Sequence, residues 1–214
     1  MANACLQLSG FMVSCIGWIG IIIATATNDW VVTCKYGMNT CKKMDELGAK
    51  GLWADCVIST ALYHCVSLTQ ILDLPAYIQT SRALMITASI LGLPAVALVL
   101  CSMPCINLGN EPESAKNKRS VLGGILILII AMCGIVSTVW FPIGVHREQG
   151  LMSFGFSLYA GWVGAAFCFL GGCLITCCSM ESPAPYADNN RFYYSKQGPN
   201  TIPPSTNHAK SAHV

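Results

Sequence analysis

Residues 30–65 read WVVTCKYGMNTCKKMDELGAKGLWADCVISTALYHC, and the rest of the chain is organised around this segment. It contains two tryptophans and four cysteines, namely Cys34, Cys41, Cys56 and Cys65. Apolar runs that are long enough to cross a membrane lie on both sides of it. A polar, cysteine-rich segment between two such runs indicates a function in contact or permeation rather than in metabolism.

The composition is that of an integral membrane protein. Hydrophobic residues make up 54% of the 214 residues and charged residues only 10%, whereas soluble proteins contain about 25% charged residues. The mean hydropathy of the chain is +0.55. The net charge of +2 is too small to indicate nucleic-acid binding.

Four windows of about 20 apolar residues, the length that a hydrocarbon core of ~30 Å requires, predict four membrane-spanning helices. They cover residues 6–27, 83–103, 121–141 and 158–180. None of them contains Asp, Glu, Lys, Arg or His, which argues against proton relays, ion-coupled carriers and voltage sensors. The first window lacks the basic start of a cleavable signal peptide, so we expect it to be an uncleaved anchor.

Small residues recur along the spans, and they favour close helix packing within a membrane. The first span contains Gly10, Ser14, Gly17 and Gly20. Such residues allow two helix backbones to approach each other closely. We therefore expect a compact four-helix bundle.

Cysteines and basic residues together predict the topology. Paired cysteines persist only on an oxidising face of a membrane, so we place the loops 28–82 and 142–157 outside the cell. The short loop 104–120 contains three Lys or Arg residues, which suits a cytoplasmic position. Both termini are then cytoplasmic, and a four-span domain, residues 1–180, is followed by a tail, residues 181–214.

The first outer loop is predicted to contain a small antiparallel β-sheet. Residues 30–34 and 51–58 are rich in the β-branched and aromatic residues that strands prefer. A sheet of this size needs a covalent or metal staple, which a Cys56–Cys65 disulfide, and a second one between Cys34 and Cys41, would supply. Four cysteines allow three pairings. A zinc site with His64 is the competing interpretation, disfavoured because the segment has no C-x-x-C motif.

Arg82 and three cysteines stand at predicted membrane boundaries. An arginine at the edge of a span ordinarily extends its charge to the interface, but Arg82 could instead brace loop carbonyls or the face of a tryptophan. Cys105, Cys177 and Cys178 are candidates for S-palmitoylation at the cytoplasmic boundary. The alternative for each cysteine is a small hydrophobic side chain without modification.

The tail is rich in Pro, Ser, Asn and Lys and cannot bury a core, so we expect disorder there. It ends at His213 and Val214. A terminal carboxylate on an apolar residue can add as a strand to a PDZ domain, which predicts PDZ scaffold proteins as partners.

These features together resemble the claudin family. Its signature is a tryptophan, a Gly-Leu-Trp motif and two cysteines in the first outer loop, followed by an arginine. The matching residues here are Trp30, Gly51, Leu52, Trp53, Cys56, Cys65 and Arg82. Further stretches, including TNDWVVTC, SLYAGW, NRFYY and AKSAHV, are similar to a subgroup of the family found in myelin and Sertoli-cell junctions.

The resemblance implies a protein of tight-junction strands that interacts with itself and with other claudins, within one membrane and across the cell gap. It implies that Cys56 and Cys65 form the family's disulfide, that Trp30 seats the sheet at the membrane and that Arg82 braces it. It also implies that Val214 engages junctional PDZ scaffolds. Membrane lipids are the remaining expected partner, and no cofactor or metal is expected.

Charges in the first outer loop are candidates for lining the paracellular path, because a low-dielectric wall strengthens their field on passing ions. They are Lys42, Lys43, Asp45, Glu46, Lys50, Asp55 and Asp73. Their mixed signs suit a seal better than a selective pore. In several pore-forming claudins the residue after the second cysteine is charged, whereas here it is Val66.

Three other functions are alternatives to a structural barrier. A charge-selective paracellular pore would use the same loop, and a regulatory subunit of a channel or receptor would use the same fold. An enzyme is least expected, because the sequence shows no paired carboxylates, nucleophile–base set or phosphate loop.

Overall fold

The computed structural model describes residues 2–34, 47–58, 63–70, 73–103 and 112–180. The chain divides into two units, Met1–Ser182 and Pro183–Val214, and all described residues belong to the first unit. The predicted tail therefore lies outside the described residues, and so do His213 and Val214.

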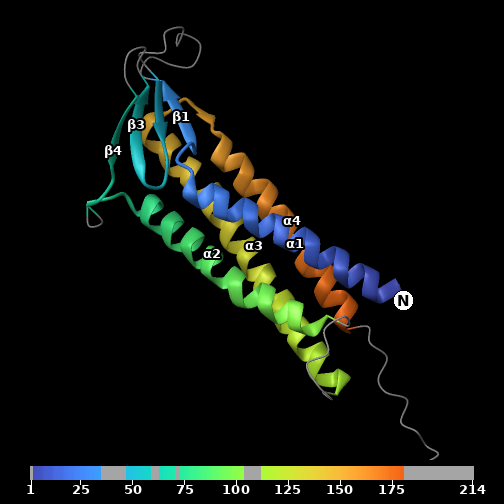
Figure 1. Ribbon diagram of the computed structural model, residues 1–214. Coiled ribbons are helices and arrows are strands. Elements are labelled where there is room, and N and C mark those ends of the chain that lie inside the picture. Colours follow the sequence, from blue (N-terminus) through green and yellow to red (C-terminus); the bar gives the residue numbers. More distant parts are fainter. Residues whose placement is uncertain (1, 35–46, 59–62, 71–72, 104–111, 181–214) are drawn as a thin grey trace, which may run out of the picture. The chain divides into compact units, whose positions relative to one another are not determined.

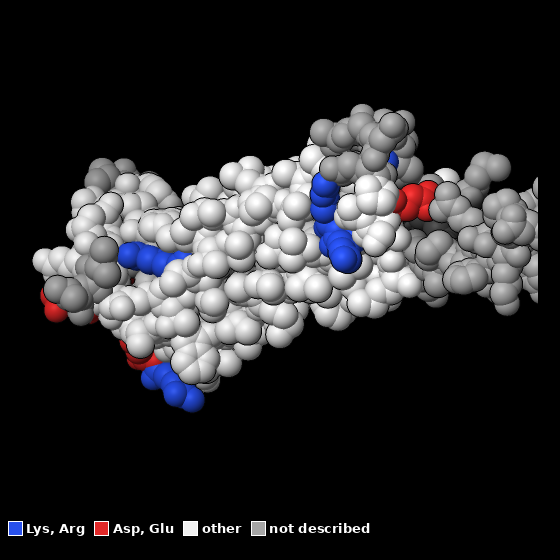
Figure 2. Space-filling model, turned by 90° about the horizontal axis from the view of Figure 1, so that it is seen from below, with Lys and Arg blue, Asp and Glu red and all other residues white. Residues whose placement is uncertain are grey.

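Four described helices are long and apolar enough to cross a membrane, which confirms the predicted four-span bundle (Figure 1). They are α1 (Ala2–Ala26), α2 (Ala76–Ser102), α3 (Glu113–Gln149) and α4 (Phe156–Met180). In Figure 2 a band without Lys, Arg, Asp or Glu crosses the middle of the bundle, and charged side chains lie on either side of it. Large apolar side chains are exposed within the helices, such as Leu93 at 63% and Ile90 at 61%. In a chain of this kind, such a surface is suited to lipid rather than water.

All four helices are longer than the apolar windows that predicted them, and two of them, α2 and α3, are longer by a turn or more. α2 begins at Ala76 rather than at residue 83, and α3 runs from Glu113 to Gln149 rather than over residues 121–141. The windows detect only the apolar part of a helix, whereas polar residues can continue it. In α3, Glu113 in the first turn and His146 and Arg147 in the last turn complement the helix dipole.

Small residues bring α1 and α4 into close contact, as expected. A Cβ atom added to Gly17 would lie 2.7 Å from the carbonyl oxygen of Gly164. One added to Gly171 would lie 2.7 Å from the carbonyl oxygen of Gly10. Neither approach is possible with a larger residue unless the helices separate.

The strands form one antiparallel sheet in the order β4-β3-β2-β1-β5. The first outer loop supplies β1 (Val31–Cys34), β2 (Leu47–Lys50), β3 (Ala54–Ile58) and β4 (Tyr63–Ser67), and the connection between α3 and α4 supplies β5 (Met152–Phe154). The sheet lies at one end of the bundle, where α1 ends and α2 begins, and this end is called the sheet end below (Figure 1). The sequence predicted strands only over residues 30–34 and 51–58, so β2, β4 and β5 are additional strands. The three residues of β5 are too few to show the alternation that marks a strand.

Candidate functional site

Trp30 joins the sheet to the bundle. Its side chain is fully buried, and its indole N–H donates to the carbonyl oxygen of Ala24, 2.9 Å away, at the end of α1. Its ring lies 5.0 Å, centroid to centroid, from the ring of Phe141 in α3, which in turn meets Tyr77 of α2 at 5.7 Å. A buried indole is stable only when its N–H has a partner. Trp30 therefore connects the start of β1 to three helices through one packed aromatic cluster.

The sequence predicted that the Gly-Leu-Trp motif begins a strand. In the structure this motif forms a tight turn instead. The amide of Gly51 donates to the carbonyl oxygen of Ala54 at 3.1 Å, and β3 begins only at Ala54. A Cβ atom on Gly51 would lie 2.1 Å from the carbonyl oxygen of Asn28, so this position requires glycine. The turn buries Leu52 completely and leaves Trp53 39% exposed.

Asn28 holds this turn, a role that the sequence alone did not indicate. Its Oδ1 accepts hydrogen bonds from the amides of Trp53, at 3.0 Å, and Ala54, at 3.2 Å. Its Nδ2 donates to the carbonyl oxygen of Ala54 at 2.9 Å. Asn28 follows α1 and precedes Trp30 by two residues, but nothing in a single sequence links it to residues 51–54. The link becomes visible only when the turn is folded back onto the end of α1.

Arg82 makes the contacts expected of a brace. Its Nε donates to the carbonyl oxygen of Leu52, and its Nη2 donates to that of Leu68 at 3.2 Å. Its guanidinium carbon lies 5.2 Å from the centre of the Trp53 ring, within the range of a cation–π interaction. The indole N–H of Trp53 itself donates to the carbonyl oxygen of Thr25 at 2.6 Å. Arg82 thus ties the start of α2 to the turn and to the segment that leaves β4.

A disulfide joins Cys56 of β3 to Cys65 of β4, as predicted. The two residues are direct cross-strand partners, with Cα atoms 4.0 Å apart. Their thiols are consumed in this bond, which excludes both from a zinc site. Cys34 is also disulfide-bonded, but Cys41 lies outside the described residues, so the pairing of Cys34 with Cys41 stays a prediction.

Three of the seven candidate path-lining charges lie in the described part of the chain, namely Lys50, Asp55 and Asp73. The other four lie outside the described residues, namely Lys42, Lys43, Asp45 and Glu46. Asp55 is half-buried in β3, and Asp73 is exposed between β4 and α2. Contrary to expectation, Lys50 does not present a free ammonium group to solvent, because its side chain is only 10% exposed and its Nζ lies 3.3 Å from Oε2 of Glu148.

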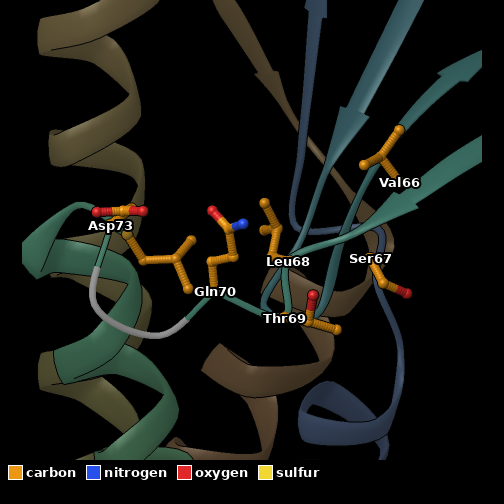
Figure 3. Close-up of a pocket in the computed structure, with 7 residues that line it drawn as sticks. Val66, Ser67, Leu68, Thr69, Gln70 and Asp73 are labelled. Carbon is orange, nitrogen blue, oxygen red and sulfur yellow. The ribbon is translucent and has the colours of Figure 1, made fainter.

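A hollow of about 400 Å³ lies where β4 leads towards α2 (Figure 3). The residues that line it are Val66, Ser67, Leu68, Thr69, Gln70, Asp73 and Leu74. It is open to solvent, and Asp73 supplies the one carboxylate among its lining residues. The Leu68 carbonyl that Arg82 holds belongs to the same segment, so the brace also fixes one wall of the hollow.

Two of the candidate lipidation sites, Cys177 and Cys178, lie towards the last turn of α4, away from the sheet. Cys177 is exposed with a free thiol, and Cys178 is half-buried. Cys105 lies outside the described residues. Palmitoylation of these cysteines stays a prediction.

Comparison with known proteins places this arrangement in a family. The family model described as PMP-22/EMP/MP20/Claudin matches residues 4–175. The chain is 56% identical to Claudin-11 of Mus musculus and 55% identical to Claudin-11 of Homo sapiens, each over 214 residues and the whole of both chains. It is 34% identical to Claudin-1 of Mus musculus over 203 residues, which cover 87% of this chain and 94% of that one.

The full-length likeness covers the spans, the stapled sheet and the tail alike. It confirms the resemblance that Trp30, the Gly-Leu-Trp turn, the two cysteines and Arg82 indicated in the sequence. The chain belongs to the PMP-22/EMP/MP20/Claudin family, and within it to the claudins.

Proposed function

We propose that this chain is a structural protein of tight-junction strands, which assembles within the membrane and across the cell gap to seal the paracellular path. The observation that carries the proposal is the likeness to Claudin-11 over the whole of both chains. It is supported by the way in which Trp30, Asn28 and Arg82 fix a stapled sheet on one end of a four-helix bundle. A sheet held in this way can meet a second sheet without losing its own shape. The role is structural rather than catalytic.

The sheet end faces outward and both termini face the cytoplasm in this proposal. The Cys56–Cys65 disulfide lies at the sheet end, and disulfides persist on an oxidising face. Lys116 and Lys118 lie at the other end of α3, where the positive-inside rule favours a cytoplasmic position. Val214, with His213 before it, then lies where PDZ scaffold proteins of the junction can bind it.

A barrier fits the described charges better than a selective pore does. Lys50 is paired with Glu148, and the residue after Cys65 is the uncharged Val66. A selective pore needs charges of one sign along the path. The partners in such a barrier are other copies of this chain and other claudins, in the same membrane and in the opposing one, together with membrane lipids.

The test is expression in epithelial cells that lack endogenous claudins. Freeze-fracture reports whether strands form, and transepithelial resistance with dilution potentials reports what they do. Continuous strands with raised resistance and little preference between sodium and chloride are expected. Strands with a strong preference for one ion would make the chain a pore former, and surface delivery without strands would favour a regulatory subunit of a channel or receptor.

Removal of Val214 provides a matched variant for the cytoplasmic part of the proposal. Its spans and sheet are unchanged, so strands and resistance should form when the variant is overexpressed. Recruitment of PDZ scaffold proteins to those strands should be lost. Equal recruitment with and without Val214 would contradict the assignment of a PDZ ligand.

A further inference from the structure

Glu148 lies at the sheet end of α3, and two other elements contact its carboxylate. Its Oε2 accepts a hydrogen bond of 2.7 Å from the hydroxyl of Tyr77 in α2 and lies 3.3 Å from the ammonium group of Lys50 in β2. The same ammonium lies 5.8 Å from the centre of the Tyr77 ring. One carboxylate oxygen therefore meets groups from the sheet and from a second helix.

Asp55 brings a second carboxylate to the same lysine. Lys50 and Asp55 are direct partners in the register of β2 and β3, and cross-strand partners project from the same face of a sheet. Among the described residues, Lys50 is therefore a cation placed between two acidic residues, one on the sheet and one on α3. Without it, the sum of these three charges falls from minus one to minus two.

The two members of the ion pair differ in their access to solvent. The Lys50 side chain is 10% exposed, whereas that of Glu148 is 42% exposed. Removing the lysine charge would thus leave a solvated carboxylate at the surface rather than a buried one. A solvated carboxylate attracts cations from the neighbouring solution, and a narrow path with a low-dielectric wall strengthens the attraction.

We propose that Lys50 masks the carboxylates of Glu148 and Asp55, and that this masking keeps the paracellular path beside the sheet from preferring cations. The inference rests on the proposed barrier function and adds a residue that determines its selectivity. Lys50 acts here from beneath the surface, by neutralising charges that would otherwise face the path.

The test compares dilution potentials of strand-forming variants in cells that lack endogenous claudins. Lys50→Gln should raise the sodium-to-chloride permeability ratio about twofold. A change of this size requires a shift in local potential that is smaller than the several kT that charged clefts reach. Glu148→Gln should lower the ratio, because Lys50 then faces Asp55 alone. The double variant Lys50→Gln with Glu148→Gln restores the original sum of charges and should return the ratio close to its starting value.

Arg147→Gln is the matched control. Arg147 is exposed and adjacent to Glu148 in α3, and its replacement removes the same charge without touching the ion pair. It should leave the ratio within experimental error. A shift as large as that of Lys50→Gln would show that any nearby positive charge matters, and would overturn the assignment to Lys50.

The remaining outcomes separate this inference from the proposed function. Strands of normal appearance with an unchanged ratio in Lys50→Gln overturn masking and leave the barrier function intact. If Lys50→Gln does not reach the surface, Glu148→Gln decides, since an unchanged ratio in that variant also overturns masking. Absence of strands with the unsubstituted protein overturns the proposed function and this inference with it.

Discussion

The two sides of the sheet are held to the molecule by different means. On one side, β1 and β5 are tied into the bundle: Trp30 is fully buried, its carbonyl oxygen accepts from the amide of Gly155 at 2.8 Å, and that of Asp29 accepts from Ser157 at 3.0 Å. On the other side, every residue of β4 is exposed. The disulfide to β3 and the backbone ladder hold β4 in the sheet, and Arg82 binds the carbonyl oxygen of Leu68, the residue that follows β4.

This contrast has a consequence for stability. The β1–β5 side depends on burial of apolar side chains. Truncation of one such side chain can therefore lower the stability of the whole molecule. The β3–β4 side depends on a local covalent link, whose loss should be felt mainly by the outer strand. A sheet attached in this way offers a firmly seated edge and an outer edge that faces solvent along its whole length.

Trp30→Ala should produce the largest effect. It removes a fully buried indole that packs on Phe141 and donates to Ala24, and such truncations cost about 3–5 kcal/mol. We expect a strongly lowered melting temperature in detergent and poor delivery to the cell surface. Tyr63→Ala, which truncates a side chain 61% exposed on β4, is the control and should change the melting temperature little. Equal losses in the two variants would remove the contrast between the sides.

Replacing Cys56 and Cys65 together by serine should have the next largest effect. Opening a loop of this length costs about 2.5 kcal/mol by the chain-entropy relation. Hydrogen exchange should rise in β4 (Tyr63–Ser67) while β1 (Val31–Cys34) keeps its protection. Cys177→Ser, at the far end of α4, controls for loss of a thiol. Exchange that rises equally in β1 and β4 would show that the disulfide supports the whole sheet.

The sequence was sufficient where one strong signal decides the structure. Uninterrupted apolar runs predicted the four helices. Four cysteines on a β-rich segment predicted a disulfide staple, and the resemblance to claudins selected Cys56 and Cys65 among the three pairings that these cysteines allow. Hydropathy could not show that α3 continues to Gln149, because its last turn contains the polar residues His146, Arg147 and Glu148. Glu148 contacts Lys50 of the sheet, which is a tertiary contact that a local apolar window cannot detect.

The sequence was insufficient where two distant residues form one unit. Lys50 and Glu148 are both ordinary charges in the sequence, and only the fold shows that each neutralises the other. The short β5 is a strand because it pairs with β1, rather than because of its own three residues. Pairing of this kind depends on tertiary contacts that local patterns do not encode.

Asn28 should produce the smallest of the three effects. It tests whether the β1–β5 side and the β3–β4 side of the sheet are stabilised separately, because it binds the turn between them. Asn28→Ala removes its hydrogen bonds to Trp53 and Ala54 and should cost about 1.5 kcal/mol, the cost of leaving backbone groups of a turn unsatisfied. Asn28→Asp keeps an acceptor for the two amides but loses the donor to the Ala54 carbonyl, so a smaller loss is expected. Melting temperature in detergent ranks the variants, and hydrogen exchange locates the damage.

The position of that damage decides between two accounts of the turn. If the turn belongs to the bundle side, exchange in Asn28→Ala should rise around residues 51–54 and at the end of α1 (Ala2–Ala26), while the disulfide keeps β4 protected. If exchange rises in β4 instead, the hydrogen bonds of Asn28 stabilise the outer strand β4 as well, through β3. The seated edge and the exposed edge would then form one cooperative unit, in which the turn acts together with the contact between Arg82 of α2 and Leu68 after β4.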